Sequence, residues 1–373
     1  MWQFEVLHDF VVGSAPNWEI VQRGRAGNTI DHMKLKEFAK QLGLSPTTVS
    51  RALSGYPEVS EKTRQRVTEE AVRLGYRPNI NAVRLVTGRA GAIGVVMGRS
   101  GEFQFSEYMS GMAERLDSED IDILVSPLAE QGGKNENQLY SRLATSGRVD
   151  AVIIHSPMPN DERITLLHRL GMPFLVHGRS ETQVPHAWLD IDNEGAIRRA
   201  TSHLIDLGHR RIAMINGRAG LTFSLHRDKG YREALAQRGI QFDPHLVAHG
   251  HFTDELGFRF ARSFLEQSPR PTAFVAGSMM TALGVYRAVR SFGLVVGRDI
   301  SVIAHDDVFP YLTADNMVPS LSTTRSSLRA AGARSADLVL QLLSGRPATE
   351  IHELWPVELI LRESTGPVPQ APG

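Results

Sequence analysis

The chain has 373 residues, 42% of them hydrophobic and 22% charged, and it contains no cysteine. This length predicts two or three domains with sizeable cores. The lack of cysteine excludes a disulfide framework, a zinc–cysteine site and a cysteine nucleophile. No apolar run reaches the length of a membrane span, and the first 30 residues lack the basic start and apolar core of a secretory signal.

The net charge is zero, but the charge is unevenly distributed. Residues 33–90 hold 11 Lys and Arg against 5 Asp and Glu, whereas residues 91–373 are mildly acidic. A short basic segment on an acidic chain suggests an anionic polymer as partner. A solvated helix face gives a similar excess, so the charge alone leaves both interpretations open.

Residues 1–32 have no convincing periodicity, because glycines and a proline interrupt every candidate helix. Met33 stands immediately before the first strongly patterned segment. Our hypothesis is that Met33 is the natural start and that residues 1–32 are a non-native or disordered extension. A short ordered arm is the alternative.

Short helices are predicted from Lys34 to about Ala90. The first ends at Gly43, which suits the left-handed conformation that closes a helix. Ser45 can cap the second helix, whose first turn accommodates Pro46, and Ser60 can cap the third. The apolar side chains predicted to face inward are Leu35, Phe38, Ala39, Leu42, Val49, Ala52, Leu53, Val67, Ala71, Val72 and Leu74.

From Ile93 onward, near-continuous apolar runs alternate with amphipathic helices, which indicates buried parallel sheets. Residues 91–366 are too many for one such sheet, so we predict two lobes. The proline-rich residues 367–373 are predicted to be a disordered tail. The predicted strands are Ile93–Met97, Ile121–Val125, Ala151–Ile154, Phe174–Val176, Ile212–Ile215, Ala273–Val275 and Ser301–Ala304.

The segment Leu35–Leu53 has the pattern of a helix, a tight glycine turn and a second helix that carries small polar side chains and Arg51. Two helices that cross through a short turn present a recognition helix to the major groove of DNA. Arg51 can donate in bidentate fashion to a guanine. On spacing alone, an ordinary helical hairpin with a polar face is an alternative.

A longer pattern surrounds this segment, and its residues are Ala39, Gly43, Ser45, Thr48, Val49, Ser50, Arg51, Val59, Ser60, Thr63, Arg64, Gly75, Tyr76, Pro78, Asn79, Ala82, Arg84, Leu85 and Ile93–Val95. The pattern resembles the DNA-binding head of the LacI/GalR family of bacterial transcription regulators. Later landmarks resemble the effector domain of the same family, which is built like a periplasmic sugar-binding protein. They are Asp192–Ala196, Leu207–Ile212, Arg227–Leu235, Ala282–Gly284, Asp299–Ile303, Ser322–Arg325 and Pro356–Thr365. Within the family, the resemblance is nearest to regulators of α-glucoside utilisation.

The resemblance implies which residues contact DNA. Direct readout falls to Pro46, Thr47 and Arg51, and Pro46 has no backbone N–H to donate, so Thr47 and Arg51 are expected to carry most of it. Leu85 matches the hinge-helix leucine that wedges into the minor groove, although by itself it would suggest a core leucine. The full predicted set is Pro46, Thr47, Thr48, Ser50, Arg51, Asn79, Ala82 and Leu85.

The resemblance also implies an effector site in a cleft between two lobes, outside the carboxyl ends of the strands. Arg227 and Asp306 stand at effector-contacting positions and suit the hydroxyls of a sugar, with an ion pair between the lobes as the alternative. Trp188 is a further stacking candidate or a surface-packed aromatic. The full predicted set is Phe103, Gln104, Phe105, His177, Arg179, Asp192, Arg227, Ser278 and Asp306.

The sequence therefore predicts an N-terminal all-α helix-turn-helix head with a hinge helix, followed by an α/β two-lobed periplasmic-binding-protein-like effector domain. The expected boundaries are residues 33–78 for the head, 79–90 for the hinge helix and linker, and 91–366 for the effector-binding and dimerisation domain.

The expected function is a ligand-responsive, cytoplasmic, nucleoid-associated repressor of sugar utilisation genes, α-glucosides in particular. The expected partners are a palindromic operator, a sugar effector and a second copy of the chain, without a membrane, cofactor, metal or catalytic residue. One alternative is a solute-binding protein of the periplasmic type without a regulatory role. Another is a sugar-processing enzyme, which would need a nucleophile, metal or phosphate loop that the sequence does not show.

Overall fold

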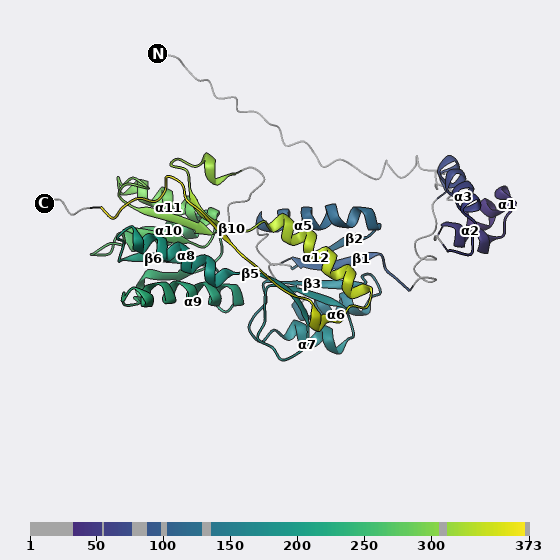
Figure 1. The fold of residues 1–373 in the computed structure, drawn as a ribbon, viewed down its shortest axis with the longest axis horizontal. Coiled ribbons are helices and arrows are strands. Elements are labelled where there is room, and N and C mark those ends of the chain that lie inside the picture. Colours follow the sequence, from purple (N-terminus) through teal and green to yellow (C-terminus); the bar gives the residue numbers. More distant parts are fainter. Residues whose placement is uncertain are drawn as a thin grey trace, which may run out of the picture. The chain divides into compact units, whose positions relative to one another are not determined.

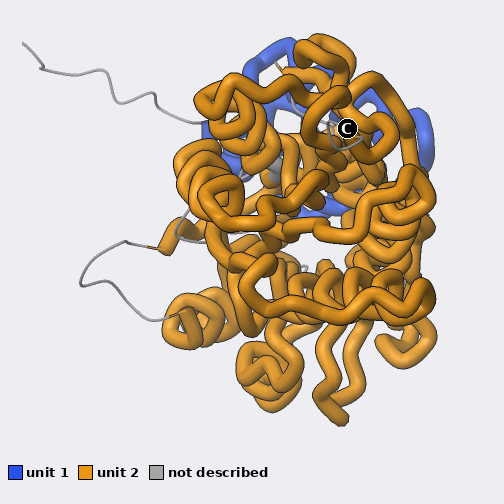
Figure 2. The backbone as a smooth tube through the Cα atoms, turned by 90° about the vertical axis from the view of Figure 1, so that its left-hand side faces the viewer, with its two compact units in different colours: residues 1–88 blue, residues 89–373 orange. Residues whose placement is uncertain are grey.

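The computed structural model describes residues 33–53, 56–76, 88–97, 103–128, 136–305 and 312–369. The chain divides into two compact units, residues 1–88 and 89–373, which Figure 2 shows in different colours. Among the described residues, no helix is long and apolar enough to cross a membrane. The N-terminal segment 1–32 and the predicted hinge helix lie outside the described residues.

The first unit contains the predicted helix-turn-helix. Its described helices are α1 (Leu35–Leu42), α2 (Pro46–Leu53) and α3 (Glu61–Leu74). Gly43 closes α1 at a φ of 65°, in the left-handed region. The Oγ of Ser45 accepts the backbone N–H of Thr48 over 3.0 Å, and Ser60 caps α3 in the same way. These caps confirm the predicted starts and ends of the helices.

The core of this unit lies between the three helices. The rings of Phe38 and Tyr76 stack with their centroids 4.2 Å apart, and Val49 is fully buried. The prediction for Val72 was wrong, because this side chain is 79% exposed. Ala71 is the buried residue of that turn, and the next position in a helix points about 100° away from it.

The second unit has two lobes, each a parallel sheet with helices on both faces (Figure 1). The strand order in the first lobe is β11-β5-β4-β3-β1-β2. Its strands are β1 (Ala92–Met97), β2 (Asp122–Pro127), β3 (Ala151–His155), β4 (Phe174–His177), β5 (Ala187–Ile191) and β11 (His352–Trp355). Its helices are α5 (Phe103–Leu116), α6 (Glu136–Thr145), α7 (Glu162–Arg169) and α12 (Leu328–Leu343).

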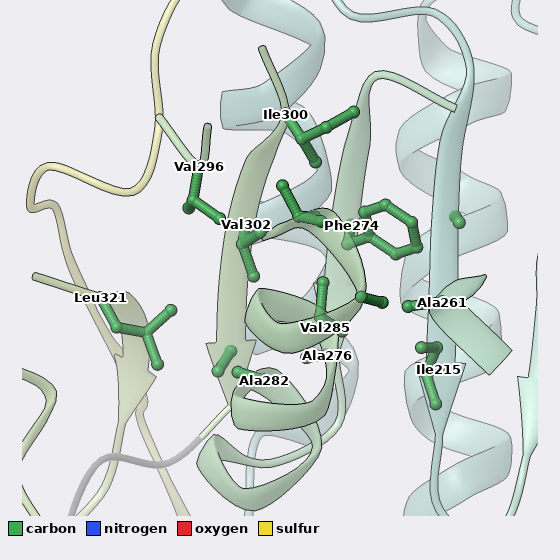
Figure 3. Packing of buried hydrophobic residues seen from close by; sticks show 14 of the residues in the cluster. Ile215, Ala261, Phe274, Ala276, Ala282, Val285, Val296, Ile300, Val302 and Leu321 are labelled. Carbon is green, nitrogen blue, oxygen red and sulfur yellow. The ribbon is translucent and has the colours of Figure 1, made fainter. Parts of the chain in front are cut away.

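The second lobe repeats this plan with the strand order β12-β10-β9-β8-β6-β7, in which only β12 is antiparallel to its neighbour. Its strands are β6 (Ile212–Asn216), β7 (Val247–His249), β8 (Ala273–Ala276), β9 (Ser301–His305), β10 (Ser322–Arg325) and β12 (Glu358–Ile360). Its helices are α8 (Asn193–Asp206), α9 (Thr222–Gln237), α10 (Asp254–Leu265) and α11 (Met279–Ser291). Figure 3 shows its largest core, in which Phe274 and Val302 from the sheet face Val285 on α11.

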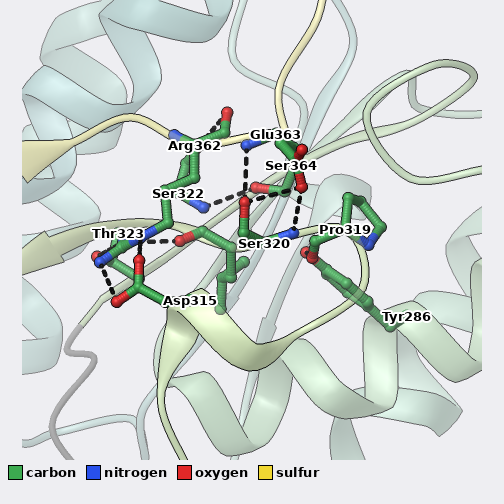
Figure 4. A network of polar contacts seen from close by, with 10 residues as sticks. Tyr286, Asp315, Pro319, Ser320, Ser322, Thr323, Arg362, Glu363 and Ser364 are labelled. Atoms are coloured by element: carbon green, nitrogen blue, oxygen red, sulfur yellow. Dashed lines mark hydrogen bonds and ion pairs between the residues drawn. The ribbon is translucent and has the colours of Figure 1, made fainter.

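The chain passes between the lobes three times, at residues 191–193, 325–328 and 355–358. After the last passage, a polar network binds the C-terminal segment to the second lobe (Figure 4). Arg362 donates from Nε to Asp315 over 2.6 Å, and Ser364 accepts the backbone N–H of Ser322 over 2.7 Å. The backbone N–H of Val368 donates to the carbonyl of Leu207 over 2.9 Å, so this residue of the predicted disordered tail is bound to the second lobe.

Candidate functional site

The second helix of the head presents a polar surface. Pro46, Thr47 and Arg51 are exposed, whereas Thr48 and Ser50 are half-buried. Residues four positions apart share a helix face, so Thr47 and Arg51 lie one above the other. The other three predicted DNA contacts lie outside the described residues; they are Asn79, Ala82 and Leu85.

The second unit encloses a cavity between its lobes, with about 570 Å³ of empty space, part of it open to solvent. It lies at the carboxyl ends of strands from both sheets, where an open α/β sheet binds its ligands. Its lining combines imidazoles, a carboxyl group, a guanidinium and two phenyl rings. The lining residues are His155, Ser156, Pro157, His177, Gly178, Asp190, Ile191, Asn193, Phe223, Arg227, Phe252, His305 and Leu328.

Arg227 on α9 is the buried cation of this cavity, with 5% of its surface exposed. Its Nε donates to Oδ1 of Asn193 over 2.8 Å, and a terminal nitrogen donates to the carbonyl of Gly277 over 2.9 Å. The guanidinium lies over the rings of Phe223 and Phe252, at 4.9 and 5.6 Å from their centroids. A cation between two aromatic rings gives this wall of the cavity both polar and apolar contacts for a ligand.

Asp190 supplies the carboxyl group of the cavity. Burial raises the pKa of Asp190, and the Arg179 guanidinium opposes this shift. Arg179 donates from Nε to Asp190 over 2.7 Å and lies over the ring of Trp188. His226 of the second lobe approaches the same carboxyl group to 4.0 Å, so side chains of both lobes meet at Asp190.

Three histidines line the cavity, namely His155, His177 and His305. The Nδ1 atoms of His155 and His177 lie 2.8 Å apart. Burial, and secondly the neighbouring His155, hold the pKa of His177 well below its ordinary value. His305 contacts the hydroxyl of Thr324 over 2.9 Å, and burial together with Arg227 lowers the pKa of His305.

The loop after β3 closes one side of the cavity and touches the other lobe. Ser156 has a φ of 50°, an uncommon conformation for a residue with a side chain. The buried guanidinium of Arg163 donates to the carbonyl of Ser156 over 3.2 Å. The carbonyl of Pro157 accepts the backbone N–H of Thr222 over 2.9 Å. This hydrogen bond joins the first lobe to the start of α9 in the second.

The structure brings two of the predicted effector residues, His177 and Arg227, directly to the cavity. Arg179 reaches it through Asp190, and Phe105 packs edge-on against the ring of His155 at 5.7 Å. The alternative of an ion pair between Arg227 and Asp306 lies outside the described residues, as do the side chains of three predicted residues. They are Phe103, Gln104 and Asp306.

Asp192 and Ser278 do not line the cavity, because each caps a helix. Asp192 accepts the backbone N–H of Gly195 over 2.8 Å at the start of α8. Ser278 accepts that of Thr281 over 3.1 Å at the start of α11. Among the lining residues that sequence reasoning missed are the polar and aromatic side chains of His155, Asp190, Asn193, Phe223, Phe252 and His305. A search for polar residues at the ends of predicted strands would have found His155 and His305.

A helix-turn-helix head followed by a two-lobed α/β domain with a cavity between its lobes defines a ligand-controlled DNA-binding regulator. The chain belongs to the LacI family of bacterial regulatory proteins. The family description "Bacterial regulatory proteins, lacI family" matches residues 34–79, and "Periplasmic binding protein-like domain" matches residues 201–365.

Curated relatives match almost the whole chain. The HTH-type transcriptional regulator AglR of Rhizobium meliloti (strain 1021) is 47% identical over 342 residues, which cover 90% of this chain and 95% of the relative. The HTH-type transcriptional regulator RafR of Escherichia coli is 33% identical, with 87% and 96% covered. The chain is accordingly an HTH-type transcriptional regulator, and the solute-binding alternative is not supported.

Solved structures agree with this assignment. The lac repressor dimer bound to operator and the anti-inducer ONPF has a TM-score of 0.77 at 27% identity, with 89% of this chain and 99% of that chain covered. The complex of the transcriptional regulator CelR with cellobiose has a TM-score of 0.67 at 28% identity, with the same shares covered. The predicted fold class is confirmed.

Proposed function

We propose that the protein is a homodimeric repressor that binds a palindromic operator and releases it when a neutral sugar of the α-glucoside class enters the cavity between the lobes. The cavity carries this proposal, because phenyl rings beside Arg227 and a carboxyl group at Asp190 suit a ligand with apolar faces and many hydroxyls. The related complexes with operator and with cellobiose support the two partners. The α-glucoside class follows the resemblance to regulators of α-glucoside utilisation.

In the head, Thr47 and Arg51 read base edges in the major groove, and Pro46 contributes an apolar contact. Thr48, Ser50 and Asn79 position the phosphates, while Ala82 and Leu85 belong to the hinge helix that enters the minor groove. Two heads related by the symmetry of a dimer match a palindromic site.

The sugar acts by shifting a population of lobe arrangements. A difference of about 2–3 kcal/mol between its affinities for the two arrangements gives roughly 30- to 150-fold control of operator binding. In this scheme the head is formed by residues 33–78, the hinge and linker by residues 79–90, and the effector-binding and dimerisation domain by residues 91–366. Residues 1–32 have no part in this scheme. The protein acts in the cytoplasm, on the chromosome, and catalyses no reaction.

The test is a fluorescence-anisotropy titration against DNA upstream of the gene, with and without a panel of α-glucosides, at a fixed salt concentration. Tight binding that one α-glucoside relieves is the expected result. Tight binding that no α-glucoside alters would contradict the proposed effector class. A lack of specific binding by the full chain and by a chain starting at Met33 would contradict the proposed regulation of that DNA.

A further inference from the structure

The histidine pair at the cavity has no role in the proposal so far. His155 ends β3 and His177 ends β4, and the two are register partners on neighbouring strands. Their Nδ1 atoms lie 2.8 Å apart, and the ring planes differ by 16° with the centroids 4.9 Å apart. A short distance between ring nitrogens of nearly coplanar rings is the geometry of an edge-to-edge N–H···N hydrogen bond.

This hydrogen bond couples the tautomers of the two rings. A neutral imidazole carries one proton, so the ring that donates from Nδ1 has a bare Nε2, and the ring that accepts at Nδ1 has a protonated Nε2. The side chain of His177 lines the cavity and is only 8% exposed. Among the described residues, His155 is its hydrogen-bond partner, at Nδ1, and none bonds to its Nε2. Tyr108 packs on the ring of His177, with centroids 4.5 Å apart, and holds it in place.

We infer that His177 binds a hydroxyl group of the effector through Nε2, and that His155 is a positioning residue that occupies Nδ1 of His177 and so leaves Nε2 for the ligand. The inference rests on the proposed function and deepens it. A hydroxyl both donates and accepts, so it satisfies Nε2 of His177 in either tautomer. Phosphate and carboxylate oxygens only accept, so they match one tautomer alone. The pair therefore accepts a hydroxyl whichever ring donates, whereas an anionic oxygen requires the tautomer in which Nε2 of His177 carries the proton.

The test compares the wild type with His177→Phe, which keeps a ring of similar shape without nitrogen. The operator-bound proteins are titrated with the releasing sugar, its monodeoxy analogues and its phosphate ester. For the parent sugar, we expect the half-release concentration of His177→Phe to rise by about 5- to 30-fold. For the one analogue that lacks the contacted hydroxyl, the two proteins should respond alike, as a double-mutant cycle requires. His168→Phe, at an exposed histidine of α7 in the same lobe, is the matched control.

The role of His155 is tested by a pair of variants. His155→Leu should weaken the response to the parent sugar, and His155→Asn should restore part of it, because an amide can still pair with Nδ1 of His177. Lost packing alone would not be rescued in this way. If His177→Phe weakens the response to every analogue equally, or to none of them, the inference is overturned. If His177→Phe fails to bind operator, His177→Leu replaces it in the titrations. A wild type that binds operator but is released by no neutral sugar would refute the proposed function instead.

Discussion

Arg227 donates its Nε–H to Oδ1 of Asn193 over 2.8 Å, and this contact ties the effector cavity to a segment that joins the lobes. Asn193 begins α8 directly after the first passage between the lobes, and its Nδ2 donates to the carbonyl of Ile191 over 3.1 Å. A ligand that competes for Arg227 therefore changes the hydrogen bonding at the passage itself. Such differential contacts are what a ligand needs to shift a two-state equilibrium.

Arg227→Lys should separate sugar response from operator binding. Lysine keeps the charge but loses the planar fork that contacts Asn193 and Gly277 together. We expect about 10- to 100-fold weaker sugar binding and a smaller change in the operator affinity measured without sugar. Isothermal calorimetry with the sugar and anisotropy with the operator measure the two quantities. Arg232→Lys, at an exposed arginine on the same helix, should behave as the wild type in both assays.

Arg51→Ala should weaken binding to the specific operator by about 1–3 kcal/mol and leave sugar binding intact. Arg51 is exposed on α2, one turn beyond Thr47, where a guanidinium can reach a base edge. The matched control is Arg73→Ala on α3, whose guanidinium is paired with Glu70. Anisotropy titrations against the operator and against scrambled DNA give the difference between specific and non-specific binding. Operator affinity equal to that of the wild type would exclude Arg51 from readout.

Strands with continuous apolar runs were predictable from the sequence. β1, β3 and β9 are buried on both faces, and their central residues are all apolar, with polar residues only at the ends of β3 and β9. β11, at the edge of its sheet, alternates exposed and half-buried residues over only four positions, so it has no such run. β5 was missed for a different reason, because the buried Asp190 interrupts its apolar run.

The cavity was only partly predictable, because its lining depends on which loops meet in space. His177 and Arg227 were found, one at the end of a predicted strand and one from the family pattern. Phe252 follows the short edge strand β7, and nothing in the sequence places it beside Arg227. Asp192 illustrates the opposite error, since a carboxylate at the start of a helix is more often a cap than a ligand contact.

Asp150→Ala should loosen the point at which the linker enters the effector domain. The two carboxylate oxygens of Asp150 accept the backbone N–H groups of Ala90 and Gly91 over 2.6 and 2.7 Å. Their loss removes two hydrogen bonds from partly buried donors, at a cost of about 1–3 kcal/mol in the free energy of unfolding. Urea denaturation measures this change. Asp122→Ala, at an exposed aspartate beginning β2, should change it by less than about 0.5 kcal/mol.

Mild acid should destabilise the effector domain. Burial lowers the pKa of His177, His186, His203, His209, His226 and His305 below the ordinary 6.5. Below pH 6.5 the unfolded chain binds protons that the folded chain does not, so the free energy of unfolding falls as the pH falls, by up to about 1.4 kcal/mol per pH unit for each titrating group. Well above pH 6.5 these groups make a constant contribution to the free energy of unfolding.

Urea titrations at intervals between pH 7.5 and 5.5 measure this slope. The raised pKa of Asp190 acts in the opposite sense, since its contribution is lost as the pH rises through the folded pKa. A free energy of unfolding that stays level down to pH 5.5 would contradict the assignment of neutral histidines to the cavity and the core.

Gly332→Ala should force apart two helices of the first lobe. A Cβ at Gly332 of α12 would lie 1.9 Å from the carbonyl oxygen of Tyr108 on α5, and one at Gly111 of α5 would lie 1.8 Å from that of Arg329. Neither obstacle is a flexible side chain, so the helix axes must move. We expect a loss of about 1–3 kcal/mol from overpacking, in spite of the better helix propensity of alanine. Ala330→Ser, at an exposed position of α12, is the control. An unchanged urea midpoint for Gly332→Ala would show that this glycine contact does not set the spacing of the two helices.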